Sequence, residues 1–290
     1  MTPTRSTSPG ARPGSLACAA AFCLALLAGC AGIAPETPGP LRPETVVAVT
    51  DAAELIRFNA GQPQRLRQRQ PLKGLDAGDR LVGIDYRVAR GVLYALSASG
   101  RLYTLNAETA QLAPVGTGAP VVLQGQRFGV DFNPAVDRVR VVSDSGQNLR
   151  LHPDTGALVA TDPNVTAPEA AAAGVRLAGA AYTYNNRDSA LTTMFVIDLA
   201  RGALMLQGSR EDVSPAVSPN TGKLTAVGDL GTGPLQDASF DIADTNNAAL
   251  AALRVGERTR LHAIDLATGR ATLIGTIGDG RALWGMAIMP

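Results

Sequence analysis

Three aspartates recur at one position of a repeated strand pattern, and their carboxylates are the strongest candidates for chemistry in this sequence. They are Asp85, Asp131 and Asp241, within the segments GIDY, GVDF and SFDI. Carboxylate oxygens are ligands that Ca²⁺ prefers, and converging carboxylates would also attract another cationic ligand. The plainer interpretation is that small and acidic residues suit a narrow, wet passage, since two further copies carry Ala181 and Ala287 there. No EF-hand-like run of ligands accompanies the aspartates, which favours this plainer interpretation.

Other residue types that carry catalysis are sparse. His152 and His262 are the only histidines, they are not equivalent in the repeat, and neither lies in an H-E-x-x-H pattern that would bind zinc. The sequence contains no G-x-S-x-G nucleophile motif and no phosphate-binding loop. We therefore predict a binding protein with no catalytic residues and no cofactor, and keep Ca²⁺ at the aspartates as the alternative.

The aspartates belong to a repeat of short strands. Residues 81–116 read as four strand-length apolar runs separated by turn residues. Copies of the first run follow at residues 129–132, 179–182 and 239–242, spaced by about 50 residues, which is typical of propeller blades. Turns with glycine, such as 153–156 and 219–222, precede the fourth run in the later copies.

The two ends of the repeat region complete each other. Residues 284–289 match the first run but have no further strands after them, whereas residues 45–72 read as three strands that lack a first. Pairing them closes a ring and leaves no unpaired sheet edge at the seam. The sequence therefore predicts an all-β fold, a β-propeller of five four-stranded blades. Six blades and a β-sandwich are the alternatives, because the long third spacing has room for another hairpin.

In a propeller the first strand of each blade lines the central channel. Because side chains alternate along a strand, each aspartate shares a face with the small residue two positions before it, and we expect that face to look into the channel. Polar loops follow two of these strands and should lie on one rim, where a ligand surface is expected. The candidate rim residues are Asn185, Asn186, Asp188, Asp244, Asn246 and Asn247. Such residues also form turns, which is the alternative.

The N-terminus carries a targeting signal. Arg5 and Arg12 precede a short apolar run at residues 16–29, which is typical of a secretory signal peptide and too short for a spanning helix. The run ends in Leu27-Ala28-Gly29-Cys30, which resembles the lipobox of bacterial lipoproteins. The resemblance implies cleavage before Cys30, lipidation of that cysteine and a membrane anchor. Ala31 in place of aspartate favours the outer over the inner membrane. An ordinary secretory signal is the alternative.

The predicted organisation is a signal peptide at 1–29, a lipidated cysteine with a proline-rich tether at 30–43, and a propeller domain at 44–290. The three cysteines all lie within the first thirty residues, so the body of the chain can contain no disulfide. Lys+Arg 26 against Asp+Glu 25 leaves a net charge of +1, which speaks against nucleic acid as a partner.

The repeat also resembles a known family. The GIDY-type strands, Phe132-Asn133-Pro134 before residues 137–142, and the segment 147–150 look like the bacterial family called domain of unknown function 4394. The resemblance covers residues 44–290 and implies extracytoplasmic, propeller-like chains without an established activity. We expect a lipid-anchored module of the cell envelope that binds a protein or a glycan, or acts as a scaffold. A metal-dependent hydrolase or lyase that uses the channel aspartates is the alternative.

Overall fold

The computed structural model describes residue 10 and residues 36–167 and 174–290. Apart from residue 10, the predicted signal peptide lies outside these residues, and so does Cys30. Two 3₁₀ helices, Val88–Arg90 and Pro219–Thr221, are the helical segments of the described ranges, and all other regular structure there is β. In the part of the chain that is described, no helix is long and apolar enough to cross a membrane.

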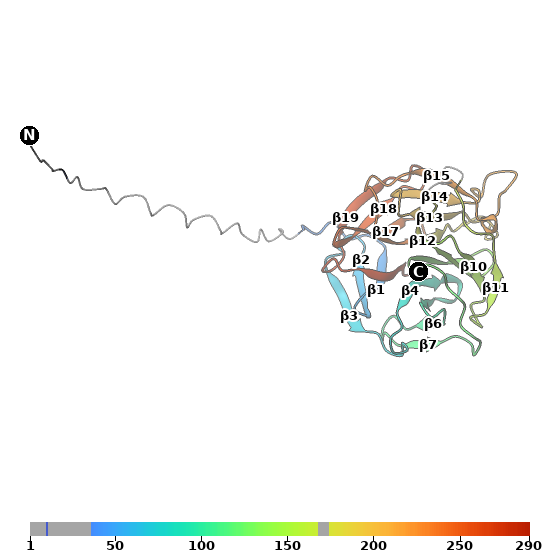
Figure 1. Cartoon of the computed structure of the whole chain (residues 1–290), viewed down its shortest axis with the longest axis horizontal. Helices are drawn as coiled ribbons and strands as arrows, with labels where there is room; N and C mark the ends of the chain where they lie inside the picture. The colour runs from blue at the N-terminus through green and yellow to red at the C-terminus, as the bar shows by residue number, and fades with distance from the viewer. Residues whose placement is uncertain (1–9, 11–35, 168–173) are drawn as a thin grey trace, which may run out of the picture. The chain divides into compact units, whose positions relative to one another are not determined.

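Twenty strands of the described segments form five four-stranded antiparallel sheets around a common centre, which confirms the five-bladed propeller (Figure 1). Blade 1 orders its strands from inside to outside as β20 (Leu283–Ile288), β1 (Thr45–Thr50), β2 (Glu54–Asn59) and β3 (Leu66–Pro71). Blade 2 contains β4 (Leu81–Arg87), β5 (Val92–Ser97), β6 (Leu102–Leu105) and β7 (Leu112–Pro114). Blade 3 contains β8 (Phe128–Asn133), β9 (Arg138–Ser143), β10 (Asn148–Leu151) and β11 (Leu158–Thr161).

The last two blades follow the same order. Blade 4 contains β12 (Leu177–Tyr182), β13 (Met194–Asp198), β14 (Ala203–Gln207) and β15 (Leu224–Asp229). Blade 5 contains β16 (Asp237–Ile242), β17 (Ala249–Val255), β18 (Arg258–Ile264) and β19 (Ala271–Thr276). The long third spacing in the sequence therefore lengthens loops within blade 4 and adds no sixth blade.

Blade 1 is assembled from both ends of the propeller sequence, as predicted. The C-terminal strand β20 pairs antiparallel with β1, in a register that places Ala48 opposite Met286. The amide of Met289 extends this pairing by donating to the carbonyl of Thr45 at 2.9 Å. The inner strand of blade 1 therefore comes from the far end of the propeller sequence. Without β20, the sheet of β1, β2 and β3 would leave an unpaired edge in the channel.

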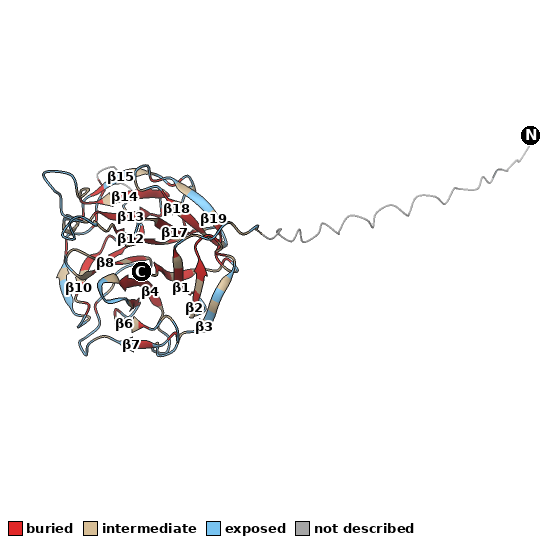
Figure 2. Ribbon diagram, turned by 180° about the vertical axis from the view of Figure 1, so that it is seen from behind, coloured by how far each residue is buried: buried red, intermediate tan, exposed pale blue. Residues whose placement is uncertain are grey.

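The apolar residues pack between the blades. Five buried clusters each join side chains of two neighbouring blades, and they are built from alternating residues of the inner and middle strands. One of them joins Tyr103 of blade 2 to Leu55 of blade 1, for example. Figure 2 shows the buried residues concentrated on these strands, whereas loops and the outer strand β3 carry exposed residues.

Glycines let the inner strands approach each other at the centre. A Cβ atom on Gly129 would lie 2.7 Å from the Cβ of Ala180 on the next inner strand, and a Cβ on Gly285 would lie 2.7 Å from the amide nitrogen of Ile84. Real Cβ atoms do not come that close, so these positions require glycine. The channel is therefore narrow, and side chains that enter it are held close together.

The segment before β1 lies on the propeller surface. The carboxylate of Glu36 accepts hydrogen bonds from the amide and the hydroxyl of Thr276 on β19, both at 2.6 Å. The side chain of Gln62 donates to the carbonyl of Gly39 at 2.9 Å. Residues 36–43 were expected to belong to an extended tether, but in the structure they pack across the seam between blades 5 and 1.

Candidate functional site

The structure brings the three channel aspartates together. Asp85, Asp131 and Asp241 each come from an inner strand, and one carboxylate oxygen of each lies within 4.8 Å of the others. Their exposed fractions are 5%, 4% and 7%, so the carboxylates are buried. The three side chains thus converge, as expected from the alternation of side chains along the inner strands.

Each aspartate holds the inner strand of the following blade. Asp85 accepts a hydrogen bond from the amide of Phe132 at 2.7 Å, and Asp131 accepts one from the amide of Tyr182 at 3.0 Å. Asp241 accepts in the same way from the amide of Ile288 at 2.6 Å. A buried amide without an acceptor is costly, so these bonds tie neighbouring blades to one another at the axis.

Two blades carry alanine at the position of the aspartates. Ala181 and Ala287 offer no acceptor to the strands that follow them. The amide of Ile242 donates instead to Asp241 of its own strand at 2.6 Å. The three carboxylates therefore accept from amides of four of the five inner strands.

Burial sets the protonation of this cluster. It raises the pKa of Asp241 to about 7. It also raises the pKa values of Asp85 and Asp131 well above the ordinary value, and each is raised further by a neighbouring carboxylate of the cluster. Adjacent negative charges in a poorly solvated site favour protonated forms, so the three carboxyl groups share protons.

The same geometry defines what the cluster can do. The three carboxylates are the described residues that could hold a cation, and Ca²⁺ would require six to eight oxygen ligands around it. Amide donors already occupy oxygens of all three carboxylates. A donor N–H repels a cation, so the arrangement fits a network that joins the blades better than it fits a metal centre.

The candidate rim residues lie where the inner strands of blades 4 and 5 end, on what we call the C-terminal rim. Asn247 joins the two loops, because its side chain accepts from the amide of Tyr184 and donates to its carbonyl, both at 2.8 Å. Asn185 accepts from the amide of Asp188 at 3.0 Å and donates to Glu211 at 3.0 Å. Asn246 donates to Glu44 at 3.2 Å. These three side chains shape the loops, whereas Asn186 and Asp188 are exposed and Asp244 is partly exposed.

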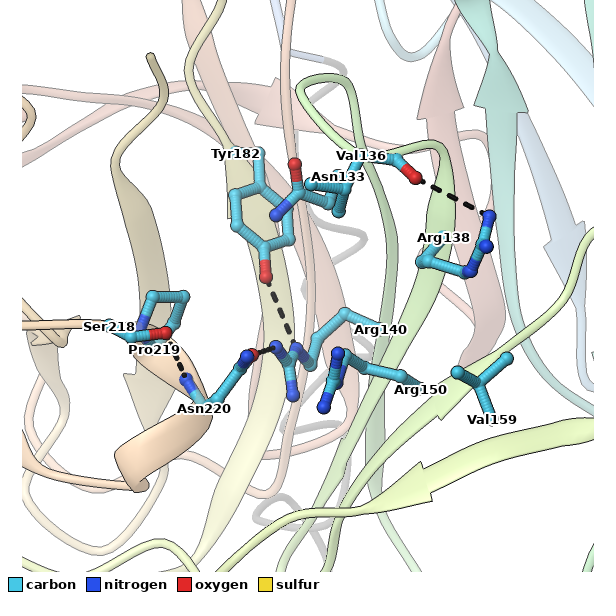
Figure 3. Close-up of a pocket in the computed structure, with 10 residues that line it drawn as sticks. All are labelled: Asn133, Val136, Arg138, Arg140, Arg150, Val159, Tyr182, Ser218, Pro219 and Asn220. Atoms are coloured by element: carbon cyan, nitrogen blue, oxygen red, sulfur yellow. Dashed lines mark hydrogen bonds between the residues drawn. The ribbon is translucent and has the colours of Figure 1, made fainter. Parts of the chain in front are cut away.

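The C-terminal rim also contains a cleft of about 320 Å³ between blades 3 and 4, which sequence reasoning did not identify (Figure 3). Arginines, hydroxyl groups and amides line it together with a few apolar side chains. Its lining residues are Asn133, Val136, Arg138, Arg140, Arg150, Val159, Tyr182, Ser218, Pro219 and Asn220.

Arg140 forms the floor of the cleft and is almost wholly buried. Its Nε donates to the hydroxyl of Tyr182 at 3.1 Å, and its Nη2 donates to the side chain of Asn220 across the cleft. Its Nη1 donates to Asp162 and to Asn148, each at 2.7 Å. A buried guanidinium is tolerated because nearly every donor has a partner.

Arg150 lies beside Arg140 and shares its carboxylate. The two arginines are directly opposite each other in the pairing of β9 with β10, and Figure 3 shows their guanidinium groups side by side. Arg150 donates to both oxygens of Asp162, at 2.9 and 2.8 Å. Burial opposes ionisation of Asp162, but hydrogen bonds from Arg150 and Arg140 hold its pKa below the ordinary value. The pair therefore carries two positive charges against one negative charge.

The position of Arg140 is apolar in every other blade. Arg140 lies on the second strand of its blade, directly opposite Asp131 of the inner strand. The residues at the same place in the other four blades are Val47, Tyr94, Phe195 and Leu250. All four are buried. A sequence signal did exist, because Arg138 and Arg140 alternate on one strand and Arg150 follows on the next. What the sequence could not show is that Tyr182 and Asn220 of blade 4 complete the cleft.

A second pocket, of about 260 Å³, lies at the opposite end of the channel. It includes Arg80, Trp284 and an ion pair between Arg127 and Asp237 at 3.1 Å. Burial raises the pKa of Asp237 to about 6, although Arg127 acts in the opposite direction. The positive and negative groups in this pocket neutralise each other, unlike those in the cleft.

The fold and the cleft define a five-bladed β-propeller with an arginine-lined cleft on one rim. Residues 54–287 match the family model described as Domain of unknown function (DUF4394), and the chain belongs to that family. A search of the curated proteins finds no match to the sequence.

Similar solved structures are propeller-like chains of low identity. A structure of a nidogen/laminin complex is 10% identical, with a TM-score of 0.49 over 85% of this chain and 98% of that chain. A glutaminyl cyclase from Myxococcus xanthus is 11% identical, with a TM-score of 0.45 over 78% of this chain and 100% of that chain. A structure described as a putative 6-phosphogluconolactonase from Bacteroides uniformis is 14% identical, with a TM-score of 0.40 over 83% and 72%.

Proposed function

We propose that this chain is a lipid-anchored β-propeller of the bacterial cell envelope that binds a protein or a glycan through its C-terminal rim. The observation that carries the proposal is the cleft between blades 3 and 4, which opens on that rim and has Arg140 at a position that is apolar in the other blades. Binding residues commonly lie on the loops of a rigid scaffold, and the closed ring is such a scaffold.

The rival hypothesis is a metal-dependent hydrolase or lyase that uses Asp85, Asp131 and Asp241. It requires carboxylates that are free to bind a metal and to act on a substrate. Their hydrogen bonds to inner-strand amides, and their burial in a narrow channel, favour a role in joining the blades. We therefore prefer binding at the rim to catalysis in the channel.

A matched pair of tryptophan substitutions tests binding at the rim. Val136 lines the cleft and is 55% exposed, so Val136→Trp should narrow the cleft without disturbing the core. Val122 is 77% exposed and lies in the connection that enters β8 from the opposite rim, so Val122→Trp is the control. Binding of the purified full-length chain to envelope polysaccharides and envelope proteins should weaken only in Val136→Trp. Equal loss in both variants, or no binding by the wild type, would contradict the proposal.

The lipid anchor has its own test. Cys30→Ser removes the thiol that the lipobox resemblance marks for lipidation, so the variant should leave the membrane fraction and float no longer with lipid vesicles. Stable anchoring takes more than one acyl chain, and each buried CH₂ contributes about 0.8 kcal/mol. Unchanged membrane association of Cys30→Ser would show that the lipid is not what holds the protein there.

A further inference from the structure

The arginine pair in the cleft has an excess of positive charge, and a ligand can reach it through the partly exposed Arg150. Arg140 and Arg150 share one carboxylate, Asp162, so one positive charge is not neutralised within the pair. The hydrogen bonds of Arg150 use its Nε and Nη2, and Nη1 makes none within the described residues. The side chain of Arg150 is 27% exposed, compared with 2% for Arg140. An anion in the cleft can therefore reach Arg150.

Two acidic residues near the cleft pair with an arginine of another blade. Asp137 and Asp154, on loops of the same blade, both pair with Arg87 of blade 2. Arg138, at the edge of the cleft, donates to the carbonyl of Asp137 at 2.8 Å and makes no ion pair among the residues that the structure describes. The residues that line the cleft thus include a further guanidinium and no carboxylate.

The remaining lining groups suit a hydroxylated ring. The amides of Asn133 and Asn220 and the hydroxyls of Tyr182 and Ser218 provide hydrogen-bond donors and acceptors. Val136, Val159 and Pro219 offer short apolar contacts, which suit the C–H faces of a sugar. The volume of about 320 Å³ lies at the small end of ligand pockets, so one monosaccharide unit would occupy it.

We propose that this cleft binds the carboxylate of an acidic sugar, such as a uronic acid unit of an envelope glycan. A single carboxylate balances the one uncompensated charge of the arginine pair, and a guanidinium matches its geometry with two parallel hydrogen bonds. The inference rests on the proposed function, of which it specifies the ligand. It assigns the buried Arg140 a role in positioning Arg150, because both are fixed by Asp162.

Calorimetric titration of the full-length chain with small probes tests the ligand class. D-Glucuronate should give saturable binding, whereas D-glucose, which lacks the carboxylate, and acetate, which lacks the sugar, should bind at least about tenfold more weakly. Glucose 1-phosphate distinguishes a carboxylate site from a general oxyanion site. Equal or tighter binding of the phosphate would overturn the assignment to a carboxylate, and equal binding of glucose would overturn the role of charge.

Variants locate the binding in the cleft. Val159→Glu places a negative charge in the cleft at a residue that is 45% exposed, and should weaken glucuronate binding at least about tenfold. Leu158→Glu is the control, because this neighbouring residue of β11 is 47% exposed and does not line the cleft. Arg150→Gln should also weaken binding, and Arg90→Gln, at an exposed arginine of the same rim, should not.

The outcomes separate this inference from the proposed function. Unchanged glucuronate affinity in Val159→Glu would overturn the cleft as the sugar-acid site. If Val136→Trp still abolished binding of an envelope protein or a neutral glycan, the rim would remain the binding surface and only the ligand class would be wrong. Val159 is on the surface, so Val159→Glu should fold even if Arg150→Gln does not. The unfolding midpoint of each variant shows whether it is folded.

Discussion

Asp131, Arg140 and Arg150 lie opposite one another in a single row across blade 3, yet the two ends of this row have different surroundings. At the channel end, Asp131 and its two counterparts are buried and hydrogen-bonded to amides that every blade possesses. At the cleft end, Arg140 occupies a position that is apolar in the other blades, whereas Arg150 has a counterpart in Arg57 of blade 1. The charge of the arginine pair exceeds that of Asp162. The comparison indicates that repeated charges hold the ring together, whereas the charge unique to one blade is available to a ligand.

Breaking the ring itself should have the largest effect. Deletion of residues 283–290 removes β20, which pairs with β1 and contributes Met286 and Ile288 to the cluster between blades 1 and 5. We expect loss of cooperative unfolding in circular dichroism, because blade 1 loses its inner strand and the axis loses the amide held by Asp241. Deletion of Pro290 alone is the control and should unfold like the wild type. A truncated chain that melts at the wild-type temperature would show that the ring does not depend on its closing strand.

The buried carboxylates should make stability fall as the pH rises. The pKa of Asp241 is raised from 3.8 to about 7, so between these values the folded state binds more protons than the unfolded state. Stability is therefore fullest below pH 4 as far as this group is concerned, and is lost as the pH rises through 7. One bound proton contributes about 1.4 kcal/mol per pH unit, and less as the group titrates near pH 7, so the free energy of unfolding should fall by about 2 kcal/mol from pH 5 to 7.

A variant isolates this contribution from other titrating groups. The pKa of the buried His262 is lowered, which acts in the opposite direction near pH 6, while the raised pKa of Asp237 acts in the same direction. Both groups remain in Asp241→Asn, so the difference between urea unfolding curves of the two proteins reports on the cluster. The slope should be smaller in Asp241→Asn. Equal slopes would mean that the channel carboxylates do not share protons as the geometry indicates.

The amide network predicts a smaller effect that depends on the substituted group. Asp131→Ala leaves the buried amide of Tyr182 without an acceptor and should reduce the free energy of unfolding by about 2 kcal/mol. Asp131→Asn keeps an acceptor oxygen and cannot ionise, so it should be close to neutral at pH 7. Urea unfolding of both variants measures the difference. An alanine variant as stable as the asparagine variant would remove the structural role of the carboxylate.

The same contrast explains what the sequence could predict. Features that recur, such as Gly83 with Asp85 and Gly129 with Asp131, are recognisable because the copies can be aligned, and they placed the inner strands and the convergence of the aspartates correctly. The hydrogen bond from Tyr182 to Asp131 was not predictable, since it depends on the offset between strands of different blades. The cleft was missed for a related reason, because its residues come from two blades and no copy of it exists for comparison.

The smallest expected effect is that of Ca²⁺ on the channel. Two oxygens from each of three carboxylates reach at most the lower limit of the six to eight that Ca²⁺ requires, and amides of Phe132, Tyr182 and Ile288 already donate to one oxygen of each carboxylate. A cation would have to break these bonds, and the strands that they join are fixed by closely packed glycines. We therefore expect millimolar Ca²⁺ to shift the melting temperature of the metal-free protein by less than about 1 °C, since ligand binding to the folded state would raise it.

A saturable shift that disappears in Asp131→Asn would instead place a cation at the axis and restore the metal-dependent hypothesis. Such a result would not affect the cleft, because its arginines pair with Asp162 and not with the channel carboxylates.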